Sequence, residues 1–355
     1  MSEELSHADS DTPAAVRVTG HGPMAGLDLV ESTRIVRGEL GRPHLPHLVE
    51  LPDRGVGADA VGRAVAILAD LTAEVLPYGW RLTQRPGHEA RRAASLLQTD
   101  LNVLGDVVGA EEEPGDELKI RVRGPLSLAA DLYLPSGERA LRDHGARRDL
   151  ADSLAAGLGE HLAAVRRAGP ARVTVHLDEP GLTEILEGAV PTASGYRTLR
   201  SVPRQEMIQS LRAVTEAARG AGAAAVVLGT DAQARTFGPL AEALAAVDVD
   251  GLAVSPHQLD VGAWETAAGL VEDGTGLWLG LLDPATPADD LPGVTRCVEE
   301  VRRPWRRLGL TDAQLSAVTL MPSAGFDGVA PQDARAVLRR LHQTADALSQ
   351  VVVDA

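Results

Sequence analysis

The chain has 355 residues, with 34 lysines and arginines against 50 aspartates and glutamates, so its formal net charge is −16. This negative charge repels nucleic acid and anionic membrane surfaces, and we expect neither as a partner. Aromatic residues make up only 3% of the chain, so Leu, Val and Ala must fill the core that a hydrophobic fraction of 44% provides. The length fits one large domain or two ordinary ones.

Cysteine usage and the N-terminal sequence indicate a cytoplasmic protein. Cys297 is the only cysteine, which excludes an internal disulfide and a zinc site with two cysteine ligands from this chain. No apolar run approaches the roughly 20 residues that span a bilayer. The opening residues are acidic and polar, without the basic and apolar regions of a signal peptide. We expect residues 1–14 to be a disordered tail.

Short apolar runs alternate with amphipathic stretches along the chain. The runs show no apolar–polar alternation, which is typical of parallel strands buried on both faces. We expect strands at residues 16–22, 47–51, 118–122, 172–177, 224–228, 251–254, 276–282 and 317–321. Helices are expected at residues 28–40, 57–71, 89–107, 137–168, 204–219, 240–246, 264–271, 294–308 and 332–352. Gly145 and Gly157 are weak points in the helix at 137–168, and Pro304 should break or kink the one at 294–308.

The count and order of these elements predict a (β/α)8 barrel, with residues 15–355 as a single domain. A doubly wound open sheet is the structural alternative. The sequence has neither a Gly-x-Gly-x-x-Gly after an early strand nor a P-loop, which weakens the nucleotide-binding versions of that alternative. The acidic loop at 111–116 is too short to divide the chain.

Residues that follow the C-terminal ends of the strands form the active site in barrels of this kind. Asp178 and Glu179 leave the most strand-like run together, directly before Pro180. Strand alternation aims one carboxylate inward and the other away. An inward carboxylate can hold an ammonium group or act as a base. The alternative is a solvated turn, or an ion pair with Arg121 or Arg123.

Two other strand ends carry candidate residues. A glycine-rich turn after the first strand contains Gly22, whose backbone can approach a carboxylate closely, and His21 as a donor. The alternative is an ordinary turn. Glu50 ends the second strand. His176 lies mid-strand, and we expect a satisfied histidine beside the core, whereas His257 is a histidine at the rim.

Three segments carry a family resemblance, namely TGHGPMAG at 19–26, VHLDEP at 175–180 and PTASGYRTLR at 191–200. With the strand pattern, they resemble the catalytic C-terminal barrel of cobalamin-independent methionine synthase and its short actinobacterial relatives, over nearly the whole chain. The resemblance implies a barrel of the methionine synthase/uroporphyrinogen decarboxylase type. It also implies methyl transfer from 5-methyltetrahydrofolate to a zinc-bound homocysteine thiolate, with Asp178 in the position that holds the amino acid's ammonium group.

The zinc ligands of that family have no counterpart in this sequence. Their positions are occupied by Leu228 and Thr230 after the fifth strand, by Ser255 after the sixth and by Ala324 after the eighth. A thiol with a pKa of about 8.5 stays mostly protonated at neutral pH unless a metal or a base deprotonates it. We therefore predict no zinc and no other cofactor for this chain.

Three hypotheses follow from these observations. The first is a methionine synthase-like enzyme with altered or lost activity that binds an amino acid or a folate-like small molecule. The second is a non-catalytic ligand-binding or scaffold protein on the same barrel. The third is a metal-free enzyme similar to uroporphyrinogen decarboxylase, although the arginine-rich N-terminal motif of that family is missing. The predicted ligand-binding residues are Asp178, Glu179, His21, Gly22 and Glu50.

Overall fold

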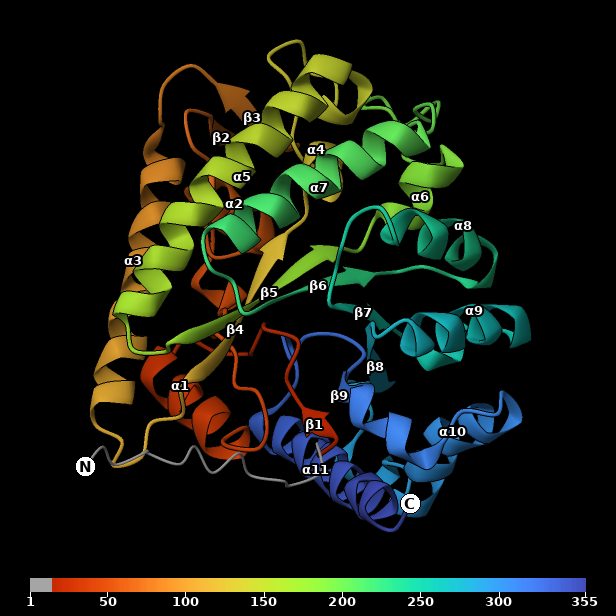
Figure 1. Cartoon of the computed structure of the whole chain (residues 1–355). Helices are drawn as coiled ribbons and strands as arrows, with labels where there is room; N and C mark the ends of the chain where they lie inside the picture. The colour runs from red at the N-terminus through yellow and green to blue at the C-terminus, as the bar shows by residue number, and fades with distance from the viewer. Residues whose placement is uncertain (1–14) are drawn as a thin grey trace, which may run out of the picture.

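A computed structural model describes residues 15–355, and the predicted tail at 1–14 lies outside these residues. Within the described range, seven parallel strands form one curled sheet in the order β1-β9-β8-β7-β6-β5-β4, with helices around it (Figure 1). The strands are β1 (Arg17–Val18), β4 (Glu117–Arg123), β5 (Arg172–Glu179), β6 (Ala225–Thr230), β7 (Gly251–Val254), β8 (Gly276–Leu282) and β9 (Val318–Pro322).

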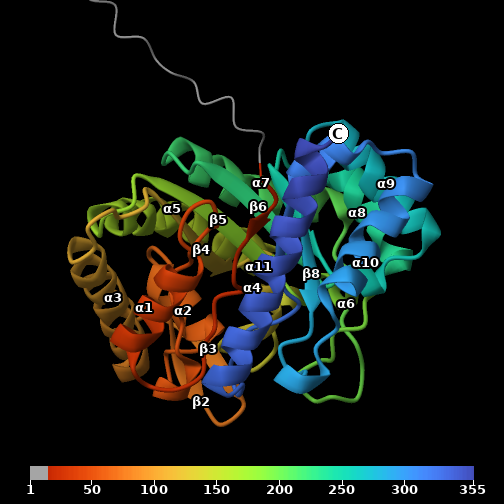
Figure 2. The same ribbon diagram turned by 90° about the horizontal axis from the view of Figure 1, so that it is seen from below.

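Helices follow the strands and pack on the outside of the sheet. They are α1 (Leu29–Glu39), α2 (Ala60–Ile67), α3 (His88–Gly109), α4 (Pro125–Asp131), α5 (His144–Arg167), α6 (Leu182–Glu187), α7 (Arg204–Gly220), α8 (Ala234–Leu244), α9 (Val261–Glu272), α10 (Val294–Arg307) and α11 (Pro331–Val353). The last helix, α11, packs across β1 and β9 and against α10 (Figure 2). Across residues 15–355, none of these helices has the length and apolar character needed to span a bilayer.

Residues 45–50 take the place of an eighth strand between β1 and β4. On one side, the Leu45 N–H donates to the Val18 carbonyl at 2.9 Å. On the other side, the Leu48 N–H donates to the Lys119 carbonyl and the Lys119 N–H to the Pro46 carbonyl, both at 2.8 Å. Pro46 has no N–H to donate, so the segment forms isolated bridges instead of a regular ladder. These bridges close the sheet, and the (β/α)8 barrel prediction is confirmed.

A two-stranded hairpin that the sequence analysis did not predict follows α2. Its antiparallel strands are β2 (Thr72–Leu76) and β3 (Gly79–Thr83). In each strand a single residue is fully buried, Ala73 in β2 and Trp80 in β3, so the hydrophobic signal in the sequence is weak. The hairpin attaches to the rest of the chain through the Leu82 N–H, which donates to the Tyr133 carbonyl at 2.8 Å.

Three helix predictions were wrong in their detail. Helix α8 begins at Ala234 and contains Pro239, whereas a helix was expected from residue 240. Pro304 was expected to break or kink its helix, and α10 continues through it, so the break does not occur in this described segment. Val301 and Trp305, on either side of the proline, are both fully buried, and their packing outweighs the loss of one backbone hydrogen bond. Helix α5 begins at residue 144 and runs unbroken past Gly157.

Strand alternation divides the side chains of the sheet into two sets. The outward set packs under the helices in one large apolar core and includes Leu118, Val175, Leu228, Leu252 and Leu320. The inward set contains a separate small cluster formed by Leu45, Val227, Ala253, Trp278 and Met321. Buried polar residues, including Lys119 of β4 and His176 of β5, also point into the barrel interior.

Gly157 marks the closest approach of α5 to the end of α2. A Cβ atom added to Gly157 would lie 1.7 Å from the Ile67 carbonyl oxygen, a distance that only a backbone shift could relieve. We predict that Gly157→Ala lowers the free energy of unfolding by roughly 1–3 kcal/mol, because the two helices must separate.

Gly159→Ala in the same helix is the matched control. Its Cβ would meet the Ala221 side chain at an ordinary 3.8 Å, so the variant should gain about 0.5–1 kcal/mol of helix propensity. Urea denaturation of both variants measures the difference, and equal stability of the two would contradict the close approach.

Candidate functional site

A cavity of about 300 Å³ opens at the C-terminal ends of the strands. Residues from β5 to β9 and from the turn after β1 form its walls. Its polar lining consists of His21, His176, Asp178, Thr230, Asp231, Ser255, Gln258 and Ser323. This mouth cavity lies where ligands bind in barrels of parallel strands.

Asp178 lines the mouth cavity and is almost fully buried. Its Oδ2 atom accepts a hydrogen bond from Arg121 Nη1 at 2.8 Å. Arg123 Nη1 lies 4.0 Å from the same oxygen, but Arg123 pairs with Asp131 at 2.6 Å. The structure therefore shows the inward orientation of Asp178 together with the ion pair to Arg121 that the sequence left as an alternative.

Glu50 takes the opposite side of the Arg121 guanidinium. Arg121 Nε donates to Glu50 Oε1 at 3.0 Å, and Arg121 Nη2 donates to Glu50 Oε2 at 2.7 Å. Burial alone would raise the pKa of Glu50, but the charge and hydrogen bonds of Arg121 outweigh it and lower this pKa to about 2. Glu50 therefore stays ionised beneath the mouth cavity and does not form part of its wall.

Gly22 covers the Glu50–Arg121 pair. Its φ angle is +146°, and a Cβ atom there would lie 2.8 Å from Glu50 Oε1 and 3.3 Å from Arg121 Nε. Glycine is needed because the turn approaches the two charged groups so closely. The structure thus places Gly22 over the ion pair, outside the lining of the mouth cavity.

Further ion pairs extend from Glu50 toward the helices α2 and α3. Arg63 Nε lies 3.9 Å from Glu50 Oε2, and both Arg63 and Arg54 pair with the buried Asp100 of α3. We call the resulting series, which has three positive and three negative side chains in alternation, the buried charge chain: Asp178, Arg121, Glu50, Arg63, Asp100 and Arg54. Alternation lets each buried charge face opposite charges, which buried ions require.

Glu179 faces away from the mouth cavity, as strand alternation requires. Its carboxylate accepts hydrogen bonds from the backbone N–H groups of Leu126 at 2.9 Å and Ser127 at 2.7 Å. Burial raises the pKa of Glu179 to about 7 in spite of these bonds. The Glu179 side chain connects β5 to the start of α4. It does not line the mouth cavity with His21 and Asp178, the residues that were predicted to bind a ligand together with it.

His21 and His176 lie together at the floor of the mouth cavity. Their ring centroids are 5.8 Å apart in an edge-to-face arrangement. Burial lowers the pKa of His21 to about 4 and holds the pKa of His176 well below its usual range, so both rings are neutral at neutral pH. Within residues 15–355 neither nitrogen of His176 has a hydrogen-bond partner, so the expectation of a satisfied histidine was wrong. His257 lies elsewhere, with Nδ1 2.9 Å from Glu300 Oε1.

Lys119 is an interior residue that the sequence analysis missed. It is the only lysine in the chain, which was the available signal. Its fully buried ammonium group donates to the carbonyls of Gly20 and, at 3.2 Å, His21. Burial lowers the pKa of Lys119 to about 7. Through these two hydrogen bonds Lys119 holds the turn after β1 in place. Its side chain does not line the mouth cavity.

The strand register corrects two of the positions assigned to zinc ligands by resemblance. Leu228 is fully buried on the helix side of β6, so the neighbouring Gly229 is the residue that lines the mouth cavity. A Cβ atom on Gly229 would lie 2.2 Å from His176 Nε2, so the imidazole ring fills the space that a side chain would need. Ala324 is exposed beyond β9, and Ser323 lines the cavity in its place.

The residues at this position do not fit a zinc ion. Thr230 and Ser255 do line the mouth cavity, but they offer hydroxyl groups, whereas protein zinc sites use cysteine, histidine and carboxylate ligands. In the part of the chain that the structure describes, no group of three or more such side chains is placed to hold a metal ion. We derive no reaction step through zinc.

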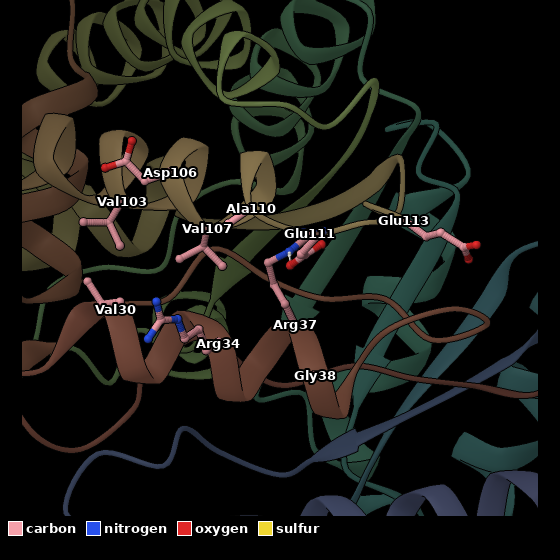
Figure 3. Close-up of a pocket in the computed structure, with 10 residues that line it drawn as sticks. All are labelled: Val30, Arg34, Arg37, Gly38, Val103, Asp106, Val107, Ala110, Glu111 and Glu113. Carbon is pink, nitrogen blue, oxygen red and sulfur yellow. Dashed lines mark hydrogen bonds and ion pairs between the residues drawn. The ribbon is translucent and has the colours of Figure 1, made fainter.

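A larger hollow, of about 450 Å³, lies on the outer surface between α1 and α3 (Figure 3). Val30 and Arg34 of α1 face Val103 and Val107 of α3 across it. At one end of this hollow Arg37 forms an ion pair with Glu111. The hollow lies away from the C-terminal strand ends, and none of the polar residues that line the mouth cavity contributes to it.

Comparisons with known proteins agree with the fold. No family model and no curated protein matches the sequence. The structure is similar to that of a B12-independent methionine synthase from Shewanella sp. W3-18-1 in complex with selenomethionine, with a TM-score of 0.62 and 11% identity over 96% of this chain and 100% of that chain. It is also similar to a putative vitamin-B12-independent methionine synthase from Listeria monocytogenes, with a TM-score of 0.53 and 14% identity over 95% and 96% of the two chains.

The chain has the fold of the B12-independent methionine synthases. The resemblance seen in the sequence is therefore confirmed for the architecture over about 95% of the chain. At this low identity the similarity concerns the fold, and the chemistry has to be argued from the residues of the site itself.

Four buried histidines should make the fold sensitive to acid. Burial lowers the pKa of His21 to about 4, that of His161 to about 3, and those of His47 and His176 well below their usual range. Between roughly pH 6.5 and pH 4 the unfolded chain therefore binds more protons than the folded one, and stability that is present above this window is lost as the pH falls through it. Burial raises the pKa values of Glu179, Asp131, Asp231 and Glu300, which opposes this trend. The lowered pKa values of His44 and His342 reinforce it.

We predict a clearly lower melting temperature at about pH 5 than at about pH 7.5, since each such histidine contributes on the order of 1 kcal/mol or more. The variant His161→Gln replaces one titrating ring by a neutral amide and should flatten the dependence. Thermal unfolding of both proteins at the two pH values measures this. A melting temperature that rises on acidification would contradict it.

We also predict that Asp178→Asn destabilises the protein by roughly 1–3 kcal/mol, because Arg121 keeps Glu50 but loses its second carboxylate. Asp131→Asn is the control, since it removes the partner of Arg123 in a more exposed pair and should cost less than about 1 kcal/mol. Chemical denaturation compares the three proteins. Unchanged or higher stability of Asp178→Asn would show that the ion pair does not support the fold.

Proposed function

We propose that the protein binds a small polar molecule in the mouth cavity without the help of a metal ion, on a barrel of the methionine synthase type. The observation that carries this proposal is the lining of the mouth cavity, in which neutral hydrogen-bonding groups converge from five strand ends. They are His21, His176, Thr230, Ser255, Gln258 and Ser323. The volume of about 300 Å³ is at the lower end of the range for small-molecule sites.

The charges around the mouth cavity disfavour an anionic ligand. Asp178 and Asp231 line the cavity, and within residues 15–355 neither a lysine nor an arginine does so. Asp231 Oδ1 accepts a hydrogen bond from the Thr183 N–H at 3.0 Å, and burial raises the pKa of this carboxyl group. A neutral molecule with hydroxyl or amide groups therefore fits better than a folate-like ligand, which carries carboxylates.

The imidazoles of the mouth cavity are poor bases for a thiol. Moving a proton from a thiol with a pKa of about 8.5 to His21, whose pKa is about 4, is unfavourable by about 6 kcal/mol. Lys119 has its ammonium group turned to backbone carbonyls. These properties support ligand binding over the methyl transfer to homocysteine that the sequence resemblance implies.

A thermal-shift screen tests the proposal, because a ligand that binds the folded state raises the melting temperature. We predict that neutral polyhydroxylated molecules raise it, and that 5-methyltetrahydrofolate does not. Ser255→Leu, which fills the mouth cavity, should abolish the shift, whereas Ser201→Leu on the surface should not.

Two results would overturn the proposal. One is a stoichiometric zinc ion in the purified protein by elemental analysis together with methyl transfer from 5-methyltetrahydrofolate to homocysteine. The other is a complete lack of ligand response in the screen, which would favour a scaffold without a ligand.

A further inference from the structure

We propose that Arg121 is an internal cation that occupies the cation-binding site formed by Glu50 and Asp178, so that the floor of the mouth cavity selects an uncharged ligand group over an ammonium group. This inference concerns specificity and rests on the proposed ligand binding. Its own test uses small cations as probes and does not require the natural ligand.

The hydrogen-bond geometry assigns the guanidinium to both carboxylates at once. Nε and Nη2 form a two-point contact with Glu50 at 3.0 and 2.7 Å, and Nη1 reaches Asp178 at 2.8 Å. Glu50 lies in the closing segment 45–50 and Asp178 at the end of β5, on the two sides of β4. Two carboxylates that converge from the two sides of β4 form a cation site. Here Arg121, a side chain of β4 itself, supplies the cation.

Burial fixes this arrangement. The side chains of Arg121, Asp178 and Glu50 keep only 10%, 7% and 3% of their surface exposed. Gly22 packs closely against Arg121 and Glu50, since a Cβ atom there would lie 3.3 Å from Arg121 Nε and 2.8 Å from Glu50 Oε1. Withdrawal of Arg121 would leave two ionised carboxylates facing one buried space, which is strongly unfavourable.

Among residues 15–355, the other cations near this position have partners of their own. Arg63 lies 3.9 Å from Glu50 Oε2 and is paired with Asp100. Arg123 lies directly opposite Asp178 in the strand register, yet it stands 4.0 Å away and is paired with Asp131. Lys119 donates to backbone carbonyls below. Because Asp178 also lines the mouth cavity, the charge that Arg121 cancels is the charge a ligand would otherwise meet at the floor.

Chemical rescue of Arg121→Ala tests the inference, because the truncation empties the space between the two carboxylates. We expect methylguanidinium chloride and methylammonium chloride to raise the melting temperature of Arg121→Ala, relative to equal sodium chloride, by about 2 °C or more at saturating concentration. The wild-type protein should show no such rise. Arg123→Ala, which removes the same charge from the same strand, is the matched control and should behave like the wild type.

A second variant keeps the test decisive if Arg121→Ala does not fold. The double variant Glu50→Gln/Arg121→Ala leaves a single carboxylate and less repulsion, and it should still respond to both cations. The inference is overturned if neither variant responds more than Arg123→Ala, or if the wild-type protein responds as strongly as Arg121→Ala. Failure of the proposed function gives a different result. Neutral ligands would then leave the melting temperature of the wild-type protein unchanged, while the two cations would still raise that of Arg121→Ala.

Discussion

The ion pairs of Arg121 join the two parts of the barrel that the chain builds separately. Glu50 belongs to the irregular segment that closes the sheet, and Asp178 belongs to its longest regular strand. The guanidinium between them holds the closing segment, β4 and β5 in register at the end where the cavity opens. Gly22 can then fold its turn down over the pair. The shape of the mouth cavity depends on the Glu50–Arg121–Asp178 cluster, because His21, which lines the cavity, precedes Gly22 in the turn that packs against this cluster.

The barrel interior has an apolar part and a polar part. Bulky apolar side chains usually fill the inside of such barrels in layers. Here Leu45, Val227, Ala253, Trp278 and Met321 form an apolar cluster, while histidines and ion pairs occupy much of the remaining inward face. Charged groups in this environment stabilise the fold only as complete pairs, since each unpaired buried ion costs several kcal/mol. The polar interior therefore contributes less to stability than an apolar one would. The large apolar core under the helices compensates for this difference.

The shared architecture and the altered site show how fold and chemistry separate. The similarity to methionine synthases extends along nearly the whole chain at 11% and 14% identity. Within the mouth cavity, however, Gly229 faces the interior and the ring of His176 fills the space beside it. The same strands, helices and core can therefore present different residues to the cavity, and the fold alone does not decide the chemistry.

The sequence by itself determined the barrel and the strand ends at which the mouth cavity opens. β7 and β8 match their predicted ranges to the residue, because strands buried on both faces appear as uninterrupted apolar runs between turn residues. The opposite orientations of Asp178 and Glu179 also follow from strand alternation alone. The hairpin β2–β3 escaped prediction because its strands bury little, and the closing segment was only partly recognised because prolines interrupt its pattern.

The partner of Asp178 was decided only by the tertiary structure. Arg121 and Arg123 lie on the same face of β4, and the sequence offers both equally. Arg123 is opposite Asp178 in the register, but Asp131 of α4 takes it, so Arg121 bridges to Asp178 and Glu50, 57 and 71 residues away along the chain. Pairing over such separations leaves no local signal, because it depends on which competing charges the packed helices and turns bring within reach.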